Sequence, residues 1–195
     1  FAVAAFTNLT EDHLDFHKTM ENYRDAKSLL FEHLTEGIKP NKNAIFNMDD
    51  ASSTIIKART KAKVLTYGKG KDNDIYPLSF TVAPKAMQLS LATPVGEMDL
   101  ELKITGEFNV YNVMGAVAAM LAENISKEII VSVLDGFAGV PGRFQLVEAG
   151  QPYTVIVDYA HTPDGLENVL KTARSITKGK LWVVFGCGGD RDNKK

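Results

Sequence analysis

The first candidates for chemistry are a lysine and its neighbours near the N-terminus. Lys27 lies in or beside the apolar stripe of a helix expected from about Met20 to Leu34. A partly buried lysine amine that loses its proton can add carbon dioxide, and the resulting carbamate is an oxygen ligand suited to Mg²⁺. A lysine that only extends along a helix flank to water is the commoner case, so residue type alone leaves both interpretations open.

His13 and His17 precede this helix and are four residues apart. On a helix that spacing places both rings on one face, as a metal site requires. The sequence shows no third ligand beside them, and a non-metal role is the alternative. His13 could also supply an imidazole beside Lys27 if the two helical stretches pack together.

Asn109 and Asn112 flank the expected start of a strongly apolar helix. A side-chain amide offers both a donor and an acceptor, so it can cap the helix or recognise the edge of a purine base. Capping is the commoner use of such residues.

Asp158 and His161 follow an apolar strand and stand just before a helix that starts near Pro163. A helix N-terminus with a carboxylate and an imidazole beside it suits a phosphate–metal site, and the alternative is an aspartate cap with a surface histidine. Arg143 follows a proline–glycine turn and is a candidate contact to phosphate or ribose. Its alternative is a surface ion pair.

A glycine-rich loop at residues 186–192 follows the last expected strand. It is not the dinucleotide-binding fingerprint, because Arg191 stands where the third glycine would be. Arg191 could hold a substrate carboxylate in a bidentate pair. The P-loop pattern G-x-x-x-x-G-K-[ST] appears nowhere in the sequence.

Strands and helices alternate along the chain and must position these residues. We expect an α/β fold with a mainly parallel sheet and an antiparallel edge, followed by the start of a Rossmann-like domain. Thr10 is the expected N-cap of a first helix. The expected strands are at 1–6, 43–47, 63–67, 78–82, 88–93, 98–104, 144–148, 155–158 and 181–185. The expected helices are at 20–34, 52–60, 113–123, 126–137 and 163–177.

Composition is that of an ordinary globular protein. The 195 residues are 45% hydrophobic and 24% charged, and their net charge is −2. This balance gives no bulk electrostatic reason to expect a nucleic acid or a membrane surface as partner. The single cysteine, Cys187, excludes an internal disulfide and fits a reducing compartment. No apolar run has the length of a membrane-spanning helix, and no signal peptide is visible.

Taken together and in order, these segments resemble the Mur ligases of bacterial peptidoglycan synthesis. The strings that carry the resemblance are NLTEDHLDFH at 8–17, YRDAK at 23–27, GEFNVYN at 106–112, PGRF at 141–144, VDYAHTPD at 157–164 and FGCGGDRD at 185–192. The last two strings favour the member that adds the third residue of the stem peptide.

The resemblance implies an ATP-dependent amide ligase of the cytoplasm that uses ATP and Mg²⁺. Such a ligase phosphorylates the terminal carboxylate of UDP-MurNAc-L-Ala-D-Glu, and the amine of a diamino acid, meso-diaminopimelate or L-lysine, attacks the acyl phosphate. We expect a monomer, and no nucleic acid or membrane as partner.

The resemblance also implies a role for each candidate residue. Lys27, carbamylated, and His13 correspond to the residues that help to hold one Mg²⁺. Asn109 and Asn112 correspond to the asparagines on the adenine side of the nucleotide. The residues that correspond to interdomain ATP contacts are Arg143, Asp158 and His161. Arg191 corresponds to the arginine that grips the carboxylate of the incoming amino acid.

The resemblance divides the chain into two parts. Residues 1–142 correspond to the C-terminal portion of the central ATP-binding domain, and residues 143–195 to the first portion of the C-terminal domain. The UDP-binding domain, the P-loop and the segment that selects the amine are expected outside the chain, so the 195 residues alone are expected to be inactive. The alternatives are a sister Mur ligase, a folylpolyglutamate synthetase, or a nucleotide-binding fragment without catalysis.

Overall fold

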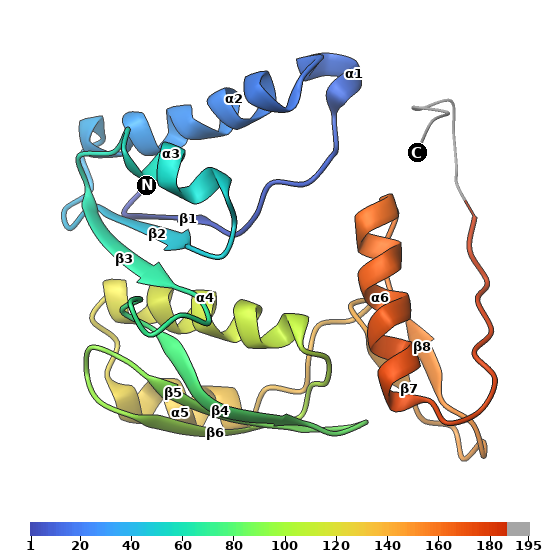
Figure 1. Ribbon diagram of the computed structural model, residues 1–195. Helices are drawn as coiled ribbons and strands as arrows, with labels where there is room; N and C mark the ends of the chain where they lie inside the picture. Colours follow the sequence, from blue (N-terminus) through green and yellow to red (C-terminus); the bar gives the residue numbers. More distant parts are fainter. Residues whose placement is uncertain (187–195) are drawn as a thin grey trace.

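A computed structural model describes residues 1–186 of the chain. Its first layer is a three-stranded parallel sheet in the order β1-β2-β3, formed by β1 (Val3–Phe6), β2 (Asn43–Asn47) and β3 (Lys63–Tyr67). Helices lie on both faces of this sheet (Figure 1). One face is covered by α2 (Met20–Glu32), a 3-10 turn (Leu34–Glu36) and α3 (Ser52–Lys57), and the short helix α1 (Leu14–His17) lies at the start of α2.

The side chains of β2 show why this sheet needs cover on both faces. Every residue of β2 is buried. Ala44 and Phe46 pack with Phe31 of α2 and Ile56 of α3, whereas Ile45 faces the opposite cluster. A strand alternates its side chains between the two faces, so an apolar β2 requires a helix layer on each side.

The second layer is a separate antiparallel sheet. It consists of β4 (Tyr76–Val82), β5 (Met87–Ala92) and β6 (Met98–Leu102). Helix α4 (Phe108–Ala122) lies between the two sheets, and α5 (Lys127–Asp135) packs beside β6 (Figure 1). The expected α/β fold is therefore confirmed, with the antiparallel strands in a sheet of their own. Their alternating buried residues, such as Leu89 and Leu100, need a full face of α4 and α5 to cover them.

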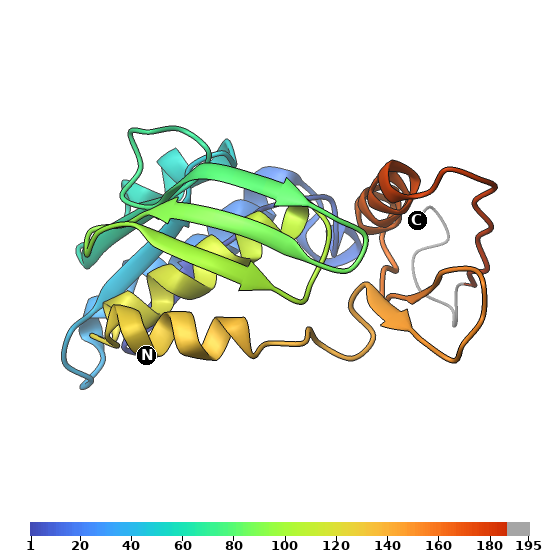
Figure 2. The same ribbon diagram turned by 90° about the horizontal axis from the view of Figure 1, so that it is seen from below.

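A smaller C-terminal part lies to one side of these layers (Figure 2). It contains an antiparallel pair, β7 (Gln145–Val147) and β8 (Val155–Val157), and the helix α6 (Pro163–Ile176). Thr162 caps α6, because its hydroxyl accepts a hydrogen bond from the N–H of Gly165, and Pro163 follows in the first helical turn.

Two expectations about local structure are wrong. Residues 181–185 form no strand, and Trp182 is 82% exposed. A parallel strand needs cover on both faces, and α6 is the only helix of the described C-terminal part. Thr10 caps no helix, since α1 begins at Leu14. The Asp50 carboxylate accepts a hydrogen bond from the N–H of Leu9. The chain therefore follows the edge of the sheet before it turns into α1.

The described residues include no helix that is both long enough and apolar enough to cross a membrane.

Replacement of Phe31 by alanine should destabilise the protein strongly. Phe31 is 2% exposed and its ring meets those of Phe6 and Phe46 at centroid distances of 6.4 and 4.9 Å. Truncating such a ring costs about 3–5 kcal/mol of unfolding free energy. Denaturant unfolding measures this loss, and Leu29→Ala on the half-exposed side of α2 is the matched control. Equal losses in the two variants would contradict the assignment of Phe31 to the core.

Candidate functional site

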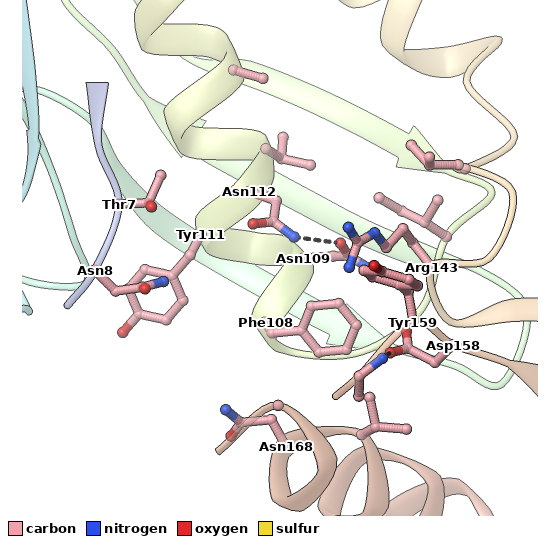
Figure 3. Close-up of a pocket in the computed structure, with 18 of the residues that line it drawn as sticks. Thr7, Asn8, Phe108, Asn109, Tyr111, Asn112, Arg143, Asp158, Tyr159 and Asn168 are labelled. Atoms are coloured by element: carbon pink, nitrogen blue, oxygen red, sulfur yellow. Dashed lines mark hydrogen bonds between the residues drawn. The ribbon is translucent and has the colours of Figure 1, made fainter. Parts of the chain in front are cut away.

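A cleft of about 920 Å³ opens between the parallel sheet, the first turns of α4 and the C-terminal part (Figure 3). One side of the cleft consists of residues that end or follow the strands of the parallel sheet. We call these residues the cleft floor. They are Thr7, Asn8, Asn47, Asp49, Asp50 and Tyr67. A cleft at the carboxyl edge of a parallel sheet is the usual ligand site of open α/β folds. Of the predicted site residues, five line it: Asn109, Asn112, Arg143, Asp158 and His161.

Asn109 and Asn112 occupy the first turns of α4. The Nδ2 of Asn109 donates to the carbonyl of Thr105 at 2.7 Å, and its Oδ1 accepts from the Nδ2 of Asn112 at 2.9 Å (Figure 3). Asn109 is thereby fixed to the turn that precedes the helix. Among the described residues no hydrogen-bond donor pairs with the Oδ1 of Asn112, so Asn112 can offer an amide acceptor and a second donor hydrogen to a ligand.

The opposite wall carries a row of three side chains in contact, Arg143, Tyr159 and His161. The guanidinium of Arg143 lies 4.9 Å from the centroid of the Tyr159 ring. His161 approaches the same ring edge-on at 4.9 Å, and its Nδ1 lies 2.9 Å from the carbonyl oxygen of Tyr159. Arg143 is the only arginine or lysine among the described residues that line the cleft, so this wall carries its fixed positive charge.

The Asp158 carboxylate links two segments of the chain next to these three side chains. One carboxylate oxygen accepts the N–H of Phe144 and the other accepts the N–H of Ala160, each at 2.7 Å. Phe144 has a φ of 45°, in the left-handed region that is strained for a residue with a side chain. The carboxylate thus ties this strained turn to the loop that carries Tyr159 and His161.

Lys27 and His13 meet elsewhere, around the ring of Tyr23. The Nζ of Lys27 lies 4.9 Å from the ring centroid, His17 stacks on the ring at 4.7 Å, and His13 approaches edge-on at 6.0 Å. None of these residues lines the cleft. The described residues contain no group of three or more histidine, cysteine, aspartate or glutamate side chains that could hold a metal ion.

Arg191 and most of the loop 186–192 lie outside the described residues, so the predicted carboxylate contact stays a prediction.

Sequence reasoning missed most of the cleft floor. Asp49 is its central carboxylate, since one of its oxygens accepts both the hydroxyl of Tyr111 and the N–H of Lys69 at 2.8 Å. The polar residues directly after β1 and β2 were the available signal, because carboxyl ends of parallel strands meet at one edge. Tyr67 and Tyr111 had no such signal, since each lies in a regular element.

Two tyrosines of the cleft hold their protons tightly. Burial raises the pKa of Tyr67 from 10.0 to about 12, and the nearby Asp50 carboxylate adds to this shift. The pKa of Tyr111 is also raised, first by burial and then by its hydrogen bond to Asp49. Both side chains are therefore neutral near neutral pH.

A cleft of this size, between the carboxyl edge of a parallel sheet, an amide-bearing helix and a wall with one arginine, is the usual place for a small-molecule ligand in an α/β protein. Two family models identify the class further. The Mur ligase middle domain matches residues 1–120, and the Mur ligase, glutamate ligase domain matches residues 142–195. The chain therefore belongs to the Mur ligases, a family of ATP-dependent ligases.

Individual relatives agree with this assignment. The chain is 50% identical over 197 aligned residues to UDP-N-acetylmuramoyl-L-alanyl-D-glutamate--2,6-diaminopimelate ligase of Bacillus licheniformis, and it spans 40% of that protein's length. A solved structure of a ligase of the same name has 33% identity and a TM-score of 0.73, and 97% of this chain aligns with 39% of it. MurF from Acinetobacter baumannii has 28% identity and a TM-score of 0.77, and the alignment covers 88% of this chain and 37% of MurF.

Asp158→Asn should loosen the turn at Phe144. An asparagine keeps one acceptor oxygen and places an NH₂ group against a backbone N–H, so one of the two 2.7 Å hydrogen bonds is lost. The expected cost is about 1–3 kcal/mol of local stability. Amide hydrogen exchange at Phe144 and Ala160 should accelerate, whereas the exposed Asp164→Asn should leave both amides unchanged. Unchanged exchange in the Asp158 variant would contradict this role.

Alkaline pH should reveal the two protected tyrosines. The chain has six tyrosines, and Tyr67 should ionise near pH 12 rather than 10. Because the folded state binds this proton more tightly, its stabilising contribution is complete below pH 10 and is lost as the pH rises towards 12. Tyrosinate absorbance during alkaline titration measures the late step, which Tyr67→Phe should diminish and Tyr153→Phe, at a 68% exposed position, should not.

Proposed function

We propose that this chain forms the nucleotide cleft of a ligase that uses ATP to join 2,6-diaminopimelate to UDP-N-acetylmuramoyl-L-alanyl-D-glutamate. The observation that carries the proposal is the meeting of Asn112, Arg143 and His161 in one cleft at the carboxyl edge of the parallel sheet. The relative from Bacillus licheniformis is named for that activity. It is identical to this chain at half of the aligned positions, over the whole chain.

The cleft offers complementary groups to the two ends of a nucleotide. The amide of Asn112, positioned by Asn109, presents an acceptor and a donor to the base. Arg143 supplies positive charge for phosphate or ribose oxygens, and Tyr159 keeps its guanidinium in place. Asp158 contributes by fixing the loop that carries His161, since both of its oxygens already accept backbone N–H groups.

Mg²⁺ belongs to the proposal only through the resemblance. Lys27 and His13 face one ring, but the described residues supply no set of three metal-binding side chains. These two side chains do not by themselves make a Mg²⁺ site. A carbamate on Lys27 stays a prediction that intact-protein mass spectrometry can test.

The remaining assignments are part of the same proposal. ATP phosphorylates the glutamyl carboxylate, and the amine of the diamino acid displaces phosphate to form the amide. The division of the chain at residue 142, a cytoplasmic location and a monomeric state also belong to it. The chain spans about 40% of the length of the curated relatives that it matches, so the activity is assigned to a longer protein that contains it.

A sister ligase with another amine is the second candidate. The fold of MurF from Acinetobacter baumannii matches closely, but its identity of 28% is well below the 50% found for the diaminopimelate ligase. Phosphate release by the full-length protein, with UDP-N-acetylmuramoyl-L-alanyl-D-glutamate and ATP present, should depend on diaminopimelate. Stimulation by L-lysine, by D-alanyl-D-alanine with a tripeptide substrate, or by glutamate with a folate would instead select a different ligase.

Asn112→Ala in the full-length protein should raise KM for ATP about tenfold, because a base contact is lost. The KM for the diamino acid should change less than twofold. Gln88→Ala, on the exposed face of the antiparallel sheet, is the matched control and should leave both constants unchanged. If the Asn112 variant keeps the KM for ATP of the control, Asn112 does not contact the base.

A further inference from the structure

Tyr67 ends β3 and belongs to the cleft floor. It is 1% exposed, yet it lines the cleft. Its ring packs against Gly115 of α4, where a Cβ atom would stand 3.3 Å from the Tyr67 hydroxyl and 3.4 Å from the carbon that bears it. The absence of a side chain at Gly115 is what lets the ring reach this position between sheet and helix.

The hydroxyl of Tyr67 has no hydrogen-bond partner among the described residues. In that part of the chain, every fully buried side-chain nitrogen or oxygen has a partner. The Tyr67 hydroxyl must therefore reach the cleft surface, and it accounts for the small exposed area of the residue. Tyr111 is the contrasting case, since its hydroxyl is already bound to Asp49 at 2.8 Å.

A hydroxyl that faces a cleft and has no partner among the described residues is free to bind a ligand atom. A ligand that covers this hydroxyl has to accept its proton, because burying a hydroxyl without a partner costs free energy. Like any tyrosine at neutral pH, Tyr67 keeps its phenolic proton and can donate it.

The charges of the cleft indicate which end of a nucleotide lies there. Asp49 and Asp50 share the floor with Tyr67 and disfavour a phosphate group beside it. Arg143, on the opposite wall, is the cation that favours phosphate. The uncharged nucleoside end is the part that the floor accepts at lower electrostatic cost.

We propose that the Tyr67 hydroxyl donates a hydrogen bond to the nucleoside end of the nucleotide in this cleft. The inference rests on the proposed function for the presence of a nucleotide. It adds a ligand contact on β3, remote in sequence from Asn112 and from the C-terminal part.

The test compares two tyrosine-to-phenylalanine variants of the full-length protein. Tyr67→Phe removes a hydroxyl that has no partner among the described residues, so the unfolding midpoint should stay unchanged or rise. Its dissociation constants for ADP and for adenosine should both increase by the same factor, about three- to tenfold. Tyr111→Phe removes a hydroxyl that binds Asp49, so its midpoint without ligand should fall. Calorimetric titration and thermal unfolding supply both readouts.

Gly115→Ala gives a second, independent variant. Its Cβ would press on the Tyr67 hydroxyl at 3.3 Å, so affinity for ADP and adenosine should fall although alanine favours the helix. Gly136→Ala is the control, because a Cβ there meets nothing closer than 3.7 Å.

Three results would overturn the inference. Equal dissociation constants for wild type and Tyr67→Phe, within twofold, would exclude the hydrogen bond. Weaker binding of ADP with unchanged adenosine binding would place the contact at the phosphates instead of the nucleoside. If the wild-type protein binds neither ADP nor adenosine, the proposed function itself fails, and the inference fails with it.

Discussion

The burial of α4 between two sheets is the constraint on which the rest of the structure depends. Five of its residues are buried, and they face the parallel sheet, the antiparallel sheet and α5. A helix held on several sides cannot slide or rotate without opening cavities in the core. Its first turns are therefore fixed at the carboxyl edge of the parallel sheet, and Asn109 and Asn112 are fixed with them.

Hydrogen bonds at that edge of the sheet also fix the loops that follow the parallel strands. Asp49 binds the Tyr111 hydroxyl of α4 and the N–H of Lys69, and Asp50 binds the N–H of Leu9. The Nδ2 of Asn47 donates to the carbonyl of Thr7. The loops after β1, β2 and β3 are thus linked to one another and to the helix, which prepares the cleft floor before any ligand binds.

The sequence predicted the helices and strands better than it predicted which side chains meet in the cleft. The bounds of β2 and β3 follow from apolar runs and are confirmed, and five predicted residues meet in the cleft. The three antiparallel strands were predicted, but not that they form a sheet of their own, because periodicity gives one buried face and not the layer that covers it. Tyr67 was missed because a tyrosine ending a buried strand looks like core. Only its unpaired hydroxyl distinguishes it, and that depends on a glycine 48 positions away in the sequence.

The cleft and the Lys27 group are separate, but one short segment joins them. Thr7 and Asn8 line the cleft, and His13, five residues after Asn8, contacts the Tyr23 ring that also faces Lys27. The segment is held at its start by Asn47 and at Leu9 by Asp50. The cleft floor and the Lys27 group are therefore joined by a short stretch of chain that is anchored at its cleft end. This segment sets the position of His13, and of the Tyr23 ring that it contacts, relative to the cleft floor.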